Sequence, residues 1–131
     1  MDIFMSYVER HKRIKKNFVV NVSELNDYIT LNVSKSGILL AVDNDIYSVN
    51  DLLNIEIDSR KIYLGKSIKC TASVERVVTS DSQEFGEYTH LLDGFFEYSA
   101  LYGLHIQDIQ DGDRRLWNTY IDYFLENVFA A

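Results

Sequence analysis

The chain has 131 residues, 47% of them hydrophobic and 13% aromatic, which argues against a disordered segment and is typical of one globular domain. Its formal net charge of −7 disfavours a DNA- or RNA-binding protein, because general nucleic-acid binding requires a broad basic face. With one cysteine, no proline, no apolar run of about 18 residues and no signal peptide, we expect a cytoplasmic protein without a disulfide, a Pro-rich linker or membrane insertion.

The first half of the chain predicts short β-strands separated by polar turns. Residues 18–22 are rich in β-branched side chains, and residues 38–42 are wholly apolar, which predicts a buried strand. Residues 52–57 predict a further strand, whereas residues 46–49 fit a weak strand or a loop. Residues 1–9 fit either a short helix or an extended segment.

Residues 28–33 show the alternation of a strand with one buried side. The positions predicted to face the core are Ile29, Leu31 and Val33. Those predicted to face away from it are Tyr28, Thr30 and Asn32. The side chain of Asn32 is therefore expected to point outward, where a surface ligand can reach it.

The clearest strand pattern comes next, at residues 68–75. Its inward positions are predicted to be Ile68, Cys70, Ala72 and Val74. Cys70 is therefore expected to be a small buried residue rather than a reactive thiol. Arg76 falls on the same apolar parity and is expected to emerge at the end of the sheet.

The last third of the chain predicts a loop, a strand and a helix. Residues 79–87 are polar and predict a loop, residues 90–102 fit a hairpin or a short helix, and residues 103–109 predict the last strand. The helix is expected to begin at Asp113, a fair N-cap. Its apolar stripe recurs at helical spacing and comprises Leu116, Trp117, Tyr120, Ile121, Phe124 and Val128.

Many short strands followed by one helix predict a mainly β fold. We expect a small antiparallel β-barrel, with the helix packed across its outside or over one end. The predicted organisation is a single domain over residues 1–131, with an N-terminal ligand loop at 1–17, the barrel at 18–110 and the C-terminal helix at 113–128. The expected oligomeric state is a monomer or a homodimer.

No group of residues predicts catalysis or metal binding. The three histidines, His11, His90 and His105, have no ligand spacing, and no Cys-x-x-Cys pair is present. The sequence also lacks a Walker loop, a Gly-x-Gly-x-x-Gly fingerprint and a Gly-x-Ser-x-Gly motif. We therefore predict that the protein is not an enzyme and has no catalytic residue, no metal site and no cofactor.

Basic charge is concentrated near the N-terminus. Residues 1–20 contain five basic and two acidic residues, a net of +3, whereas residues 79–131 contain two basic and ten acidic ones, a net of −8. The basic cluster at residues 10–16 contains Arg10 and Arg13, and a guanidinium can both grip a phosphodiester and stack on a base. The cluster suits a small anionic ligand or an acidic partner, and a solvated arm is the alternative interpretation.

A polar turn with short side chains follows at residues 32–37. Asn32 can read a base edge through its amide, and Ser34 adds one hydroxyl. Gly37 permits a positive φ and the close approach of a ligand. In the alternative interpretation, Asn32 and Ser34 only cap local backbone groups, and Gly37 has a purely structural role in the turn.

This combination resembles the PilZ domain family, the bacterial receptor for cyclic di-GMP. The family is marked by Arg-x-x-x-Arg and, later in the chain, by [Asp/Asn]-x-Ser-x-x-Gly, and residues 32–37 match the second motif in full. The first motif matches at Arg13 alone, because Glu9 lies four positions before it and Arg10 is one place off. The resemblance covers roughly residues 8–128. It implies a six-stranded antiparallel barrel, the PilZ-like split barrel, with a C-terminal helix.

The resemblance also implies a function. The domain would be a cyclic di-GMP effector that couples ligand binding to a protein partner of unknown identity, in the control of bacterial motility, adhesion or secretion. The implied ligand-binding residues are Arg13 for phosphate or stacking, Arg10 as a substitute for the missing arginine, Asn32 and Ser34 for guanine, and Gly37 for the turn. A carboxylate at Glu9 would repel a phosphate by about a kcal/mol or more. That cost favours the alternative, a degenerate PilZ-like adaptor that binds protein and not the nucleotide.

Arg114 and Arg115 fall in the first turn of the predicted helix, where the macrodipole disfavours cations. Either the nearby acids Asp111, Asp113 and Asp122 balance them, or the two arginines form an exposed basic spot for a partner.

Overall fold

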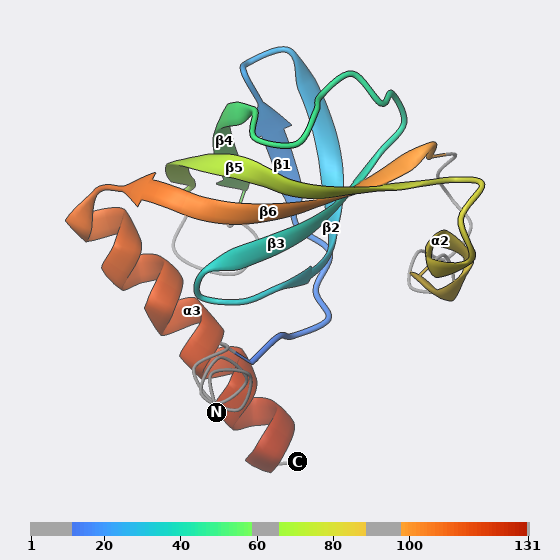
Figure 1. Ribbon diagram of the computed structural model, residues 1–131. Helices are drawn as coiled ribbons and strands as arrows, with labels where there is room; N and C mark the ends of the chain where they lie inside the picture. Colours follow the sequence, from blue (N-terminus) through green and yellow to red (C-terminus); the bar gives the residue numbers. More distant parts are fainter. Residues whose placement is uncertain (1–11, 59–65, 89–97, 131) are drawn as a thin grey trace, which may run out of the picture.

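The structure is a computed structural model that describes residues 12–58, 66–88 and 98–130. Within these residues, six antiparallel strands close into a barrel (Figure 1). The strand order around the barrel is β1-β2-β3-β6-β5-β4. The strands are β1 (Val19–Val22), β2 (Asn26–Val33), β3 (Gly37–Val42), β4 (Leu52–Asp58), β5 (Ile68–Thr79) and β6 (Ala100–Ile109), and the helices are α2 (Gln83–Tyr88) and α3 (Asp111–Ala130). The predicted fold class, a six-stranded antiparallel barrel with a C-terminal helix, is confirmed.

Apolar side chains from alternating strand positions fill the barrel. Buried members of this cluster include Val20, Val22, Ile38, Leu40, Val42, Leu53, Ile55, Ile57, Ile68, Cys70, Ala72, Val74, Tyr102, Leu104 and Ile106. The predicted inward face of β5 is confirmed, and Cys70 is buried within it.

Helix α3 covers one end of the barrel. Trp117, Tyr120 and Ile121 are fully buried and belong to the same cluster as the barrel interior. The ring of Trp117 meets that of Phe18 edge-on, with the centroids 5.9 Å apart. The predicted apolar stripe is confirmed from Leu116 to Phe124, and the side chain of Val128 lies outside the described residues. Of the two predicted positions the helix takes the one over an end.

The helix begins at Asp111, two residues before the predicted start. The Arg114 backbone N–H donates to the Gln110 carbonyl at 2.8 Å, which closes the first turn upstream of Asp113. Asp113 accepts instead from the backbone N–H of Lys69 at 3.2 Å, so this predicted N-cap connects α3 to β5.

The predicted parity of β2 is wrong in its first half. The pairing of β2 with β3 shifts register between Thr30 and Asn32, so the chain gains one residue there. Tyr28 therefore joins the barrel interior, whereas Leu31 packs outside it. Because Val33 faces inward after this bulge, Asn32 does face outward, as predicted.

A second cluster lies outside the barrel, under α2. It contains Leu31, Leu39, Ala41, Val78, Phe85 and Leu101. The prediction of a loop at residues 79–87 is wrong, because Phe85 supplies a buried side chain and the Ser82 hydroxyl accepts the Phe85 backbone N–H at 3.2 Å. These two contacts account for a short helix in an otherwise polar stretch.

Several predicted segments have other bounds in the structure or lie outside the residues that it describes. Strand β6 begins at Ala100, three residues before its predicted start, and residues 46–49 form no regular element. The predictions for residues 1–9 and most of the aromatic stretch at 90–102 fall outside the described residues. Among the helices that the structure describes, none has the length and apolar character of a bilayer-crossing segment.

Candidate functional site

The two halves of the predicted ligand site lie against each other. Ile14 and Val33 form an isolated antiparallel bridge, with N–H to carbonyl distances of 2.8 and 2.9 Å. This bridge carries Arg13 alongside the end of β2. There Arg13 Nη1 donates to Asn32 Oδ1 at 2.6 Å. The structure therefore brings together a guanidinium and a side-chain amide that are 19 positions apart in the sequence.

Gly37 lies directly beneath the Arg13 guanidinium. A Cβ at this position would be 2.9 Å from Arg13 Nη2 and 3.2 Å from the Leu104 carbonyl oxygen. The φ of Gly37 lies outside the left-handed region, so the prediction that glycine serves a positive φ here is wrong. The glycine instead provides the space that lets Arg13 lie close to the sheet.

Ser34 has its hydroxyl inside the turn. The residue is 2% exposed, and its Oγ accepts the Gly37 N–H at 3.0 Å. The Ser34 backbone N–H also donates to the Gly37 carbonyl at 2.8 Å. This geometry matches the local capping interpretation, in which Ser34 fixes the shape of the turn and Asn32 and Arg13 present polar groups to the outside.

Helix α3 holds the turn through three side chains. Trp117 Nε1 donates to the Ser34 carbonyl at 3.0 Å, and Arg114 Nη1 donates to the Lys35 carbonyl at 3.0 Å. Lys35 in turn pairs with Asp122 at 2.7 Å. Arg114 is therefore used inside the fold, whereas Arg115 is exposed. These contacts could not be predicted from sequence patterns, because they join residues about 80 positions apart.

Positive charge surrounds the site. Lys12, Arg13, Lys15 and Lys16 are exposed on the segment that leads into β1. Lys16 Nζ lies 4.5 Å from the centre of the Phe124 ring, a cation–π contact that ties this segment to α3. Clustered cations raise the local concentration of an anionic ligand. Arg10 and Glu9 lie outside the described residues.

His105 is a neighbour of the site that was treated in the sequence only as a possible metal ligand. It pairs directly with Gly37 across β3 and β6, so its side chain leaves the sheet on the same side as Arg13. It is exposed, which makes it accessible to a ligand over Gly37. Strand pairing between distant segments creates this proximity.

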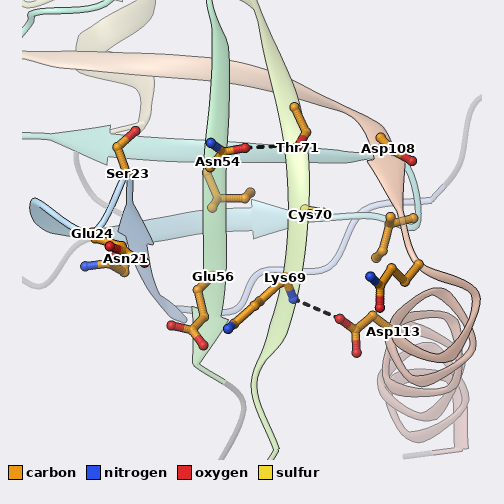
Figure 2. Close-up of a pocket in the computed structure, with 13 residues that line it drawn as sticks. Asn21, Ser23, Glu24, Asn54, Glu56, Lys69, Cys70, Thr71, Asp108 and Asp113 are labelled. Atoms are coloured by element: carbon orange, nitrogen blue, oxygen red, sulfur yellow. Dashed lines mark hydrogen bonds between the residues drawn. The ribbon is translucent and has the colours of Figure 1, made fainter.

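A groove of about 460 Å³ lies on another side of the barrel (Figure 2). Its lining contains four carboxylates and one ammonium group: Glu24, Glu56, Asp108, Asp113 and Lys69. It contains none of Arg13, Asn32, Ser34 and Gly37. An excess of carboxylates repels a phosphate, so the groove is a poor site for an anionic ligand.

Cys70 also borders this groove. Burial raises the pKa of its thiol from 9.0 to about 12. The charge of Arg114 lowers this pKa and that of Asp113 raises it, both by smaller amounts. The thiol is therefore neutral near pH 7, and a neutral thiol is a poor nucleophile and metal ligand. Among the described residues, no three His, Cys, Asp or Glu side chains gather as a metal site requires.

The barrel with a helix over one end has a PilZ-like fold. The structure is similar to that of the Bacillus subtilis inhibitor of motility (MotI/DgrA), with a TM-score of 0.69 and 16% sequence identity over 91% of this chain and 51% of that chain. At this identity the likeness shows the fold alone, and the chain spans about half the length of that protein. No family model matches the sequence, and no curated protein matches it.

Proposed function

We propose that this protein is a PilZ-like receptor that binds cyclic di-GMP and passes the signal to a protein partner. The observation that carries the proposal is the 2.6 Å contact between Arg13 and Asn32 above Gly37. It assembles residues of both family motifs on one outward face. The cations around this face suit a ligand with two phosphodiester groups.

Each site residue has a physical role in this proposal. Arg13 donates parallel hydrogen bonds to a phosphate or stacks on a guanine, and Asn32, which already fixes Arg13, reads the base edge with the rest of its amide. Ser34 fixes the shape of the turn, and Gly37, which has no side chain, leaves space for Arg13 close to the sheet. Arg10, three positions before Arg13, contributes a second guanidinium. The ligand is bound without chemical change, so the protein acts as a regulator and not as an enzyme.

The process that the protein regulates is proposed from its structural neighbour. That protein is named as an inhibitor of motility. A shared fold and a nucleotide-binding face make control of motility, adhesion or secretion the function to test first, in the cytoplasm where the nucleotide is made.

The alternative function is that of an adaptor that binds protein only. Two observations favour it: Glu9 takes the place of the first family arginine, and the Ser34 hydroxyl is satisfied inside the turn. In this case Arg13 and Asn32 bond each other for stability, and the basic face contacts an acidic protein.

Calorimetric titration with cyclic di-GMP separates the two functions. We expect the wild type to bind with micromolar or tighter affinity and Arg13→Ala to bind at least about tenfold more weakly, a loss of about 1.4 kcal/mol. Arg115→Ala, which removes an exposed arginine from α3 and not from the basic segment, is the matched control and should stay within about twofold. A wild type that releases no heat at high protein concentration would rule out the receptor and leave the adaptor.

A further inference from the structure

A second arginine lies over a second glycine on the sheet. A Cβ at Gly103 would be 2.9 Å from Arg76 Cγ and 3.4 Å from Arg76 Nε. This repeats the arrangement at Gly37, where the Arg13 guanidinium occupies the space of a missing side chain. In both places glycine lets an arginine lie flat against the strands.

Strand pairing places both arginines on one outer face. Gly103 pairs with Leu39, which is two residues after Gly37, so the two glycines are diagonal neighbours on β3 and β6. Diagonal neighbours of this kind have Cα atoms about 7–8 Å apart. Leu39 also pairs with Asn32, and Gly103 pairs with Arg76. One row across four strands thus joins Asn32 to Arg76.

A bulge is what brings Arg76 to this face. Arg76 shares the sequence parity of Ile68 and Val74, so it was predicted to lie on the inward side and to emerge where the sheet ends. The strand does not end there, because β5 continues to Thr79. The pairing of β5 with β6 shifts register between Val74 and Arg76. The extra residue rotates Arg76 to the outside, where its side chain is 49% exposed.

We propose that Arg76 is a ligand-binding residue of the cyclic di-GMP site and takes the place of the arginine missing at Glu9. Arg13 and Arg76 hold the two ends of a flat, doubly anionic nucleotide over the floor formed by Gly37 and Gly103. The inference rests on the proposed function and adds a cation from the sheet to the arginines of the N-terminal segment.

Two side chains of α2 orient the guanidinium. Arg76 Nη1 bonds to Glu84 Oε1, and the Tyr88 side chain also hydrogen-bonds with Arg76, while a guanidinium has five N–H donors in all. A ligand phosphate therefore competes with Glu84 for Arg76. Removing the Glu84 carboxylate should strengthen nucleotide binding if Arg76 contacts the ligand, and should weaken it if Arg76 only positions α2.

Titration of the full chain with cyclic di-GMP tests the inference. We expect Arg76→Ala to bind at least about tenfold more weakly and Arg76→Lys to be intermediate, because lysine keeps the charge and loses the fork. Glu84→Ala should bind as tightly as the wild type or a few-fold more tightly. Arg115→Ala, which removes an exposed arginine from α3, is the matched control and should stay within about twofold.

The results distinguish this inference from the function on which it rests. If the wild type binds and Arg76→Ala stays within about twofold of it, the inference alone is overturned. If Glu84→Ala loses as much affinity as Arg76→Ala, Arg76 acts through α2 and the inference is also overturned. If the wild type does not bind, the proposed function fails and the inference falls with it. Thermal unfolding followed by circular dichroism shows that each variant is folded before it is titrated.

Discussion

The face around Arg13 and the groove over β4 and β5 differ in charge and in the contacts that hold them in place. On the first, lysines and arginines surround a turn that three α3 side chains contact. In the second, four carboxylates face one lysine. The net charge of −7 does not reveal this difference. The strand order places the basic N-terminal segment on one side of the barrel and most of the groove's acidic residues on another. Local charge therefore favours the Arg13 face over the groove as a place for an anion.

The largest effect should follow from loosening the turn from α3. Trp117→Phe keeps a ring in the core but removes the donor to the Ser34 carbonyl, leaving that buried acceptor unpaired. We expect a loss of about 2–3 kcal/mol of unfolding free energy, together with weaker nucleotide binding. Urea unfolding followed by circular dichroism measures the first effect. Tyr123→Phe, on an exposed part of the same helix, should change stability by less than about 0.5 kcal/mol.

The next effect should separate binding from folding. In Gly37→Ala the new methyl group collides with the end of the Arg13 side chain, which can move aside. It also lies 3.2 Å from the Leu104 carbonyl oxygen, which must shift by a few tenths of an ångström. We expect about tenfold weaker binding of cyclic di-GMP with a stability change within about 1 kcal/mol. Gly86→Ala, where no heavy atom lies within 4 Å of the added methyl group, is the control: affinity should be unchanged, and stability should rise by at most about 1 kcal/mol because alanine is favoured over glycine in a helix. Unchanged affinity in Gly37→Ala would show that Arg13 is not used where the structure places it.

A smaller effect is expected at Ser34. In Ser34→Ala the Gly37 N–H loses its hydroxyl acceptor inside the turn, at a cost of about 1 kcal/mol of stability. Ser80→Ala removes an exposed hydroxyl and should be neutral. If Ser34→Ala abolishes binding while its melting temperature is unchanged, the hydroxyl contacts the ligand directly and the local capping role is wrong.

The last effect belongs to the groove and appears only at high pH. The pKa of Cys70 is about 12 in the folded protein against 9.0 for an unperturbed thiol. Below about pH 9 the thiol is neutral in both states, and above it the unfolded chain loses the proton first, so stability declines as pH rises toward 12. Unfolding at pH 7 and about pH 10.5 should show a smaller gap between wild type and Cys70→Ala at the higher pH. Rapid labelling of Cys70 by a thiol reagent at neutral pH would contradict the burial.

Much of the fold was predictable because its main patterns are local. The inward face of residues 68–74 and the stripe of α3 follow from side-chain periodicity alone, and both are confirmed, the stripe from Leu116 to Phe124. The bulges in β2 and β5 were not predictable, because register is set by the partner strand. The helix at Gln83–Tyr88 depends on a second cluster that forms only when β2, β3, β5 and β6 are assembled.

The candidate site divides in the same way. Residues 32–37 carry a contiguous motif that could be read from the sequence, whereas their contact with the basic segment depends on the bridge between Ile14 and Val33. The supporting contacts from Trp117 and Arg114, and the neighbours His105 and Arg76, come from strands and a helix that follow much later in the chain. The ligand-binding roles of Arg10, Arg13, Asn32, Ser34 and Gly37 stay predictions.

Mapping the nucleotide on the folded protein tests the basic face against the groove most directly. In an NMR titration of the ¹⁵N-labelled chain with cyclic di-GMP, we expect the backbone amides of Arg13, Asn32, Gly37, Gly103 and His105 to shift together. The amide signals of Asn54 and Thr71, which line the groove, should not shift. Shifts centred on the groove, or an unchanged spectrum at saturating nucleotide, would contradict the assignment of the ligand to the Arg13 face.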